Sequence, residues 1–130
     1  MTEFAPVVAV VPHMIGLEGD VIMNALSFAR AHLGMEIAYV AQIVGDQLEF
    51  EAVIAPNFEK TIAVGKSVPR ADTLSQHIVK GDLPELIADT SKFPFISGLG
   101  IMQKISVQAH VGIPIYRRDG SLYGVFCCVD

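Results

Sequence analysis

Two apolar segments, each interrupted by a tight turn, limit most strongly what this chain can fold into. The segment EIAYVAQIVGDQLEFEAVI (36–54) turns at residues 45–47, and ISVQAHVGIPIYRRDGSLYGVFCCV (105–129) turns at residues 119–120. Strand-length apolar runs on both sides of such a turn predict a β-hairpin. Antiparallel hairpins in both halves of the chain indicate an α+β domain with a central antiparallel sheet flanked by helices, rather than a parallel sheet.

A helix is predicted before the first hairpin. It opens at Gly19-Asp20 and ends at Gly34, where a glycine is suited to a helix C-terminus. Its apolar residues recur at helical spacing and form one stripe: Ile22, Leu26, Ala29 and Leu33. This periodicity predicts that one face of the helix packs on the sheet.

Shorter elements are predicted between the hairpins. Residues 56–70 resemble a loop, because prolines interrupt the segment. Thr73 and Gln76 fit a capping box at the start of a short helix that ends at Gly81. After it, LPELIAD is a candidate strand, and FPFISGLG (93–100) is a helical turn or loop closed by glycine.

The first strand of the 36–54 hairpin has apolar residues in both alternating sets. Ile37, Tyr39 and Ala41 would lie on one face, and Ala38 and Val40 on the other. Such a strand is expected to be covered on both faces of the sheet. The 130 residues, 52% of them hydrophobic, are enough for one domain with one core and too few for two.

Charge and hydropathy argue against two classes of partner. The net charge is −5 and the nine basic residues are scattered, so no basic stripe is present to neutralise nucleic-acid phosphates. The most apolar stretch, FAPVVAVVPHMIG, has an uninterrupted core of only Val7 to Val11, far below the ~20 residues that span a bilayer. No basic residue precedes it, as a secretory signal would require. We therefore expect no nucleic-acid or membrane partner and a cytoplasmic location.

The two cysteines, Cys127 and Cys128, are adjacent. Successive strand residues point to opposite faces, and Cα atoms ~3.8 Å apart are too close for an ordinary disulfide. Small buried hydrophobes in a core strand are the favoured interpretation, with redox sensing and metal binding as alternatives. No second cysteine pair or closely spaced histidine pair is available to complete a metal site, so none is expected.

The four histidines, His13, His32, His77 and His110, show no metal-ligating or catalytic spacing. Ser75 and His77 lie two residues apart and would project to different sides of a helix, and no nucleophile-elbow motif supports either. A catalytic role is therefore not expected.

The order of three segments resembles the GAF domain, a ligand-sensing module of bacterial signalling proteins and of some eukaryotic phosphodiesterases. These segments are GKSVPRADTLSQHIVKG (65–81), LPELIADTSKFP (83–94) and VQAHVGIPIYRRDGSLYGVFCCVD (107–130). The similarity is greatest to GAF domains that precede bacterial sensor kinases and cyclic-dinucleotide enzymes. Residues 16–130 take part in it, which leaves residues 1–15 as an N-terminal extension of a single domain.

The resemblance implies a partner on one face of the sheet. In GAF domains a helix follows the last strand, packs beside the N-terminal helix and often continues toward an effector domain. This chain has no such helix, so we expect a truncated sensor whose exposed apolar face is buried in a homodimer.

The family's cofactor signatures are missing. Bilin-binding members attach the pigment to a cysteine on a pocket helix, whereas both cysteines here are in the last strand. Haem-binding members carry a histidine upstream of the GVP-like strand motif, and IMQKISVQ has none. The signature of cyclic-nucleotide-binding members is also missing, as are the several pocket cysteines of GAF-type methionine sulfoxide reductases. The sequence therefore identifies no cofactor, and no enzyme activity is expected.

Two hypotheses remain open. In the first, the chain is a regulatory module that binds a small molecule between the sheet and segment 65–100, and binding modulates an attached kinase or cyclic-dinucleotide enzyme. The resemblance suggests these ligand-binding residues: Tyr39, Asp72, Ser75, Asp89, Phe95 and His110. For His110, a hydrogen-bonded core or rim histidine is the favoured interpretation, and a ligand contact is the alternative. In the second hypothesis, Phe93, Phe95, Ile96 and Leu99 fill the pocket and the domain is a dimerisation scaffold.

Overall fold

The structure, a computed structural model, describes residues 17–130, with side chains from residue 20 onward. A six-stranded antiparallel sheet in the order β3-β2-β1-β6-β5-β4 forms its centre. The strands are β1 (Ile37–Val44), β2 (Gln47–Ile54), β3 (Ser67–Pro69), β4 (Leu86–Ile87), β5 (His110–Tyr116) and β6 (Leu122–Val129). The α-helices are α1 (Leu17–Leu33) and α2 (Leu74–Lys80). The 3₁₀ helices are η1 (Arg70–Asp72), η2 (Thr90–Lys92), η3 (Pro94–Gly98) and η4 (Gly100–Gln103).

The two predicted hairpins are confirmed and become the centre of the sheet. β1 pairs with β2, β5 pairs with β6, and the hairpins join where β1 pairs with β6. Gly124 lies at this junction, where a Cβ atom would collide with the backbone carbonyl oxygen of Ala41. The junction thus depends on a residue without a side chain.

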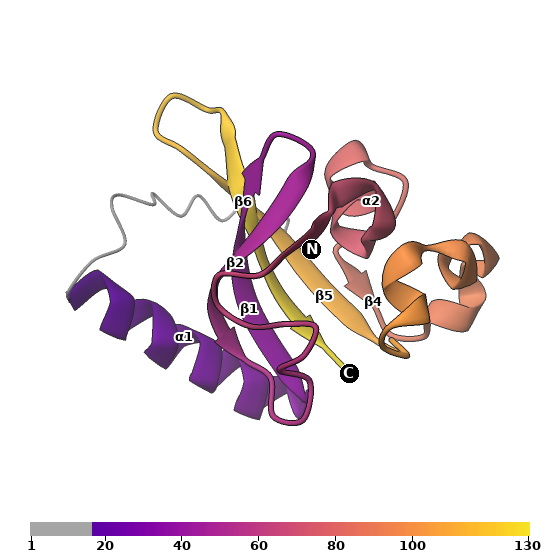
Figure 1. Ribbon diagram of the computed structural model, residues 1–130, viewed down its shortest axis with the longest axis horizontal. Helices are drawn as coiled ribbons and strands as arrows, with labels where there is room; N and C mark the ends of the chain where they lie inside the picture. Colours follow the sequence, from indigo (N-terminus) through magenta and orange to yellow (C-terminus); the bar gives the residue numbers. More distant parts are fainter. Residues whose placement is uncertain (1–16) are drawn as a thin grey trace, which may run out of the picture.

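The sheet is covered on both faces, as predicted from β1. Helix α1 lies along one side, and α2 with the 3₁₀ helices lies on the other (Figure 1). We call the face under α2 and the 3₁₀ helices the front and the face under α1 the back. Cys127 belongs to the front cluster and Cys128 to the back cluster, and both thiols are buried and free. Their interpretation as buried residues of a core strand is confirmed.

The back cluster is the smaller of the two. Leu26 of α1 is fully buried against Ala38 and Val40 of β1, while Ile22 and Ala29 are half-buried. Leu33, predicted in the same stripe, is instead 45% exposed, because it ends the helix before the left-handed Gly34. The predicted helix and its end at Gly34 are confirmed, but its contact with the sheet stops short of the last turn.

Two local predictions need correction. The segment 56–70 is not entirely loop, because Ser67–Pro69 pairs with β2 as the edge strand β3. The capping box is only half formed, since Thr73 Oγ1 accepts from the Gln76 amide but the Gln76 side chain accepts from Arg70 Nε. The Gln76 side chain therefore bonds to Arg70 instead of completing the capping box.

The predicted strand and helical turn before β5 are confirmed as β4 and η3. The apolar N-terminal stretch, His13 and the extension 1–15 lie outside the described residues. No helix within residues 17–130 is long and apolar enough to cross a bilayer.

Candidate functional site

A small cavity lies on the front face, between the sheet and the segment that contains η4. The side chains leave about 20 Å³ of space there, enough for roughly one water molecule. It is lined mainly by apolar residues, and its polar contributors are Tyr39, Thr73 and His110. The apolar lining residues are Phe50, Ile62, Val68, Leu74, Ile101, Ile105, Val107 and Val129.

His110 contributes a buried polar side chain to the lining of this cavity. The residue is 2% exposed at the start of β5, and its Nδ1 has no hydrogen-bond partner among the described residues. The favoured expectation of a hydrogen-bonded core histidine is therefore wrong at this nitrogen, although the residue is buried. Burial lowers the pKa of His110 to about 4, so the imidazole is neutral at neutral pH.

Tyr39, Ser75 and Cys127 form a buried polar cluster beside the cavity. Ser75 Oγ and Cys127 Sγ are 3.4 Å apart, and the Tyr39 phenol interacts with both side chains. Burial and the nearby Cys127 raise the pKa of Tyr39 well above its usual value, and burial raises the pKa of Cys127 to about 11. All three groups are therefore protonated at neutral pH, and the thiol is not activated as a nucleophile.

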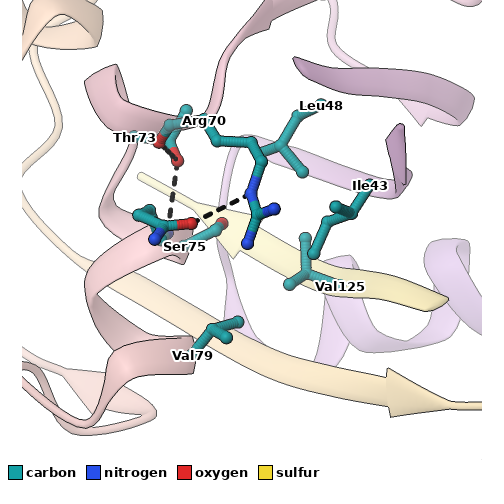
Figure 2. A pocket seen from close by; sticks show the side chains of 8 residues that line it. Ile43, Leu48, Arg70, Thr73, Ser75, Val79 and Val125 are labelled. Carbon is teal, nitrogen blue, oxygen red and sulfur yellow. Dashed lines mark hydrogen bonds between the residues drawn. The ribbon is translucent and has the colours of Figure 1, made fainter. Parts of the chain in front are cut away.

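The N-terminus of α2 is held by a polar network on the other side of Ser75. Thr73 Oγ1 donates to the Arg70 carbonyl at 2.8 Å, and the Arg70 guanidinium donates to Gln76 and to the Gly45 carbonyl. Figure 2 shows the Arg70 side chain between Ser75 of α2 and the strand residues Ile43 and Leu48. This network fixes the start of α2 to the β1–β2 turn.

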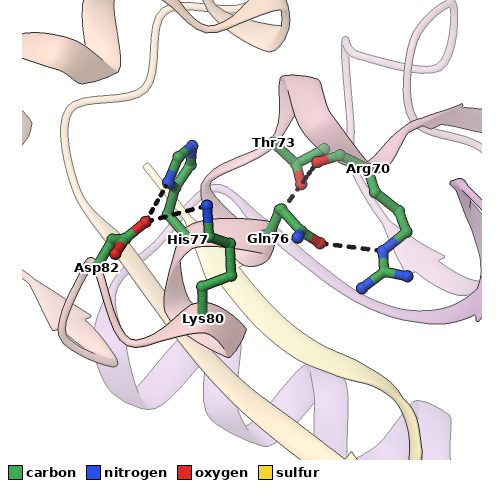
Figure 3. A network of polar contacts seen from close by, with 6 residues as sticks. All are labelled: Arg70, Thr73, Gln76, His77, Lys80 and Asp82. Carbon is green, nitrogen blue, oxygen red and sulfur yellow. Dashed lines mark hydrogen bonds and ion pairs between the residues drawn. The ribbon is translucent and has the colours of Figure 1, made fainter.

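The C-terminal end of α2 is tied down separately. His77 Nδ1 and Lys80 Nζ both contact the Asp82 carboxylate, at 3.1 and 3.5 Å (Figure 3). The hydrogen bond with His77 is the main cause that lowers the pKa of Asp82. Gly81 ends the helix in the left-handed region, as predicted. These contacts explain the polar residues of α2 that do not reach the cavity.

Only part of the predicted site comes together. Tyr39 and His110 line the cavity, and Ser75 is linked to it through Tyr39. Asp89 instead caps η2, accepting from the amide and hydroxyl of Ser91. Phe95 is 46% exposed and its ring lies 5.0 Å from that of His77.

Asp72 lies at the rim rather than in the lining. Its side chain packs against Gly100, where a Cβ atom would collide with the Asp72 carboxylate. Gly100 begins η4, and the next residue, Ile101, lines the cavity. Asp72 therefore lies at the contact between the segment before α2 and the segment that closes the cavity.

The sequence did not identify the residues that close the cavity beside η4. Ile101, Ile105 and Val107 line the cavity, although the pocket was expected to end at residue 100. Their spacing in IMQKISV follows neither a clean helical nor a strand period, so local pattern did not mark them. Of the four residues expected to fill the pocket, Ile96 is buried in the front core, Phe93 and Leu99 pack against it, and Phe95 is exposed.

Within residues 17–130, no three His, Cys, Asp or Glu side chains gather as a metal site would require. The polar groups at the cavity are neutral donors and acceptors.

Comparison of the fold with solved structures yields three informative matches. The GAF domain of an Acinetobacter phosphoenolpyruvate-protein phosphotransferase matches with TM-score 0.62 and 13% identity over 85% of this chain and 64% of that domain. A Staphylococcus aureus NreA protein, mutated in its nitrate-binding site, matches with TM-score 0.61 and 16% identity over 88% and 86%. A type II free methionine-R-sulfoxide reductase from Thermoplasma acidophilum matches with TM-score 0.61 and 13% identity over 85% and 72%. This chain thus spans less than two thirds of the phosphotransferase domain.

No protein-family model and no curated protein matches the sequence. At these identities the structural matches show the fold alone. The fold is that of GAF domains, as the sequence resemblance predicted. Proteins with this fold include both GAF domains and methionine sulfoxide reductases, so the fold does not decide between sensing and catalysis.

Proposed function

We propose that this chain, which has the GAF fold, is a regulatory domain that senses a small molecule in a cytoplasmic signalling protein of bacteria. The ligand occupies the front-face cavity and modulates an attached effector. One observation carries the proposal: His110 lines a cavity that is otherwise mostly apolar, and its buried Nδ1 has no partner among the described residues. An unsatisfied buried polar atom is costly unless a ligand or water satisfies it.

The position of His110 suits a signalling role. It begins β5, which pairs with β6, and β6 pairs with β1, on whose back α1 packs. A ligand that favours one arrangement of the front segments would thereby shift the population of arrangements felt at α1. Tyr39, Ser75 and His110 are proposed to surround the ligand, and Asp72 to act at the rim.

Asp89 and Phe95 stay predictions of the sequence that the cavity geometry does not support. A ligand that reached them would have to extend beyond the cavity, along the outside of η2 and η3.

The proposal includes the absence of catalysis. The thiols of Cys127 and Cys128 are buried, and burial raises the pKa of both. A buried protonated thiol is a poor nucleophile. Nothing at the cavity within the described residues activates one.

The proposal also includes a homodimer formed through the back of the domain. Helix α1 carries a second apolar stripe that faces outward, with Val21 64% and Phe28 70% exposed. These residues are seven apart and lie on one face of the helix. Burial of this stripe against a second copy would remove it from water.

A second function is favoured by the size of the cavity. With only about 20 Å³ of space, the front core is nearly filled, as the dimerisation-scaffold hypothesis requires. The two functions differ in whether the segment over the cavity opens to admit a ligand.

Native mass spectrometry of freshly purified protein, with an absorption spectrum of the same sample, tests the proposal. We expect extra mass on the folded dimer that is lost on denaturation and is missing from His110→Leu. The control variant His32→Leu, which changes an exposed histidine of α1, should retain it. A bare dimer from both the wild type and the control would favour the scaffold.

A further inference from the structure

The polar groups of the cavity differ in whether they already have hydrogen-bonding partners within the protein. The Tyr39 hydroxyl interacts with Ser75 and Cys127, and Thr73 Oγ1 both donates to Arg70 and accepts from Gln76. Nδ1 of His110 alone among these has no protein partner within the described part of the chain. His110 is therefore the lining residue whose hydrogen-bonding capacity is not fully used within the described residues.

The lining also restricts the charge of a ligand. No Lys, Arg, Asp or Glu is among the lining residues that the structure describes. The imidazole is neutral because burial lowers its pKa to about 4. An anion would find no positive charge here and a cation no negative one, and a buried unpaired charge is very costly.

The size of the cavity requires that a wall move when a ligand enters. Ile101 and Ile105 form the wall contributed by η4 and the following turn, and both are nearly fully buried. The segment rests on the Asp72 side chain at Gly100, where a Cβ atom would collide with the carboxylate unless Asp72 moved. No backbone hydrogen bond joins residues 100–107 to a strand among the described residues, so this wall can shift without breaking strand pairing.

We propose that the front-face cavity binds a small uncharged organic molecule whose single polar group forms a hydrogen bond with the His110 imidazole, and that segment 100–107 shifts to admit it. This inference deepens the proposed sensing function and rests on it. The ligand's apolar part lies among Ile62, Leu74, Ile101 and Ile105. A neutral imidazole donates from one ring nitrogen and accepts at the other, so a hydroxyl group, which does both, fits either nitrogen.

Four probes of similar shape test the ligand class. Phenol is neutral and has a hydroxyl group, toluene is neutral and has none, benzoate is an anion and benzylammonium is a cation. Each is titrated at pH 7 into protein labelled with ¹⁵N on histidine, and binding is measured by calorimetry. The His110 resonances are assigned by their loss in His110→Leu.

We expect phenol to bind and to move the ring-nitrogen resonances of His110 but not those of His32. Toluene should bind about tenfold more weakly, as expected for one lost hydrogen bond, and the two ions should not bind. His110→Leu should reduce phenol affinity by about the same factor. Ile105→Ala, which enlarges the cavity, should strengthen phenol binding, whereas Ile96→Ala, a buried residue outside the lining, should not.

Two other outcomes overturn the inference in distinguishable ways. Binding of benzoate or benzylammonium, or of phenol without any change at His110, would disprove the ligand class while the sensing function stands. If none of the probes binds and native mass spectrometry finds no bound molecule, the sensing function itself fails. If none binds but a copurified molecule is found, only the ligand class is wrong.

Discussion

Cys127 and Cys128 are neighbours in the chain, yet they lie in two different environments. Cys127 faces the front, beside the Ser75 hydroxyl and the Tyr39 phenol and near the His110 cavity. Cys128 faces the back, in an apolar cluster with Leu26, Ala38 and Val40. The front is covered by α2 and the 3₁₀ segments and contains several buried polar groups. The back is covered by one helix and is mainly apolar, with Tyr123, whose hydroxyl donates to Glu51, as its polar member.

This difference separates two tasks. Buried polar groups reduce stability unless they are satisfied, so their concentration on the front marks the face where binding is expected. An apolar face under a single amphipathic helix needs only packing, and its outward stripe suits assembly. The account predicts that a substitution on one face acts mainly on the task of that face.

The largest effect is expected where the two faces share a backbone. Gly124→Val would drive a side chain into the Ala41 carbonyl and separate β6 from β1. We expect loss of more than about 4 kcal/mol and failure to fold, measured by circular dichroism and soluble yield. Gly98→Ala is the control, because no atom lies within 4 Å of its Cβ position. A soluble, cooperatively unfolding Gly124→Val protein would disprove the importance of this junction.

Acid should destabilise the protein through His110, on the front face. Burial lowers the folded pKa of His110 to about 4 from 6.5, so the unfolded chain binds the proton first. Stability is then complete above pH 6.5 and falls as the pH drops toward 4, by roughly 3 kcal/mol. Urea unfolding between pH 7 and 4 measures this loss.

The matched variants for this acid effect are His110→Leu and His32→Leu. The first should remove the loss between pH 6.5 and 4, and the second should keep it. The lowered pKa values of Asp82, Asp89 and Asp119 act mainly below their ordinary value of 3.8. Identical pH profiles for His110→Leu and the wild type would contradict the assignment.

The two cysteines give a direct comparison of the faces. Cys128→Ser places a hydroxyl in the apolar back cluster and should cost about 2 kcal/mol. Cys127→Ser should cost less than about 1 kcal/mol, because Ser75 and Tyr39 can hydrogen-bond to the new hydroxyl. Chemical denaturation measures both. Equal costs, or a larger cost at Cys127, would mean that the front is no more polar than the back.

The smallest effect on stability is expected on the outer surface of α1. Phe28→Glu changes a residue that is 70% exposed, so the free energy of unfolding, compared at a concentration at which both proteins are monomeric, should change by less than about 0.5 kcal/mol. Sedimentation should nevertheless show a monomer in place of the dimer. The control Val64→Glu alters a similarly exposed residue, at 65%, and should remain dimeric. A monomeric wild type at high concentration would rule out the dimer.

The parts of the fold that the sequence predicted are those with a local signal. The two hairpins follow from turns between apolar runs, and the helix stop at Gly34 from a residue that tolerates a positive φ. The edge strand β3 was missed because three residues carry no periodicity, and its pairing with β2 is a tertiary event.

The candidate site was less predictable for the same reason. His110 was correctly placed near the cavity by the resemblance, but its unpartnered Nδ1 depends on what every neighbouring element fails to offer. Asp89 caps η2 by accepting a hydrogen bond from Ser91, and the Phe95 ring packs near His77 of α2, so neither side chain lines the cavity. Ile101 and Ile105 line the cavity because the chain folds back over the sheet at this segment, and no local sequence pattern indicates that.

Hydrogen–deuterium exchange of the protein with and without saturating phenol tests the central claim most directly. The account predicts slower exchange in segment 100–107 and in the first residues of β5, with smaller changes along β6 and β1 and in α1, which packs on β1. Protection confined to α1, or no protection at the front under conditions where calorimetry shows phenol bound, would contradict the assignment of binding to the front face.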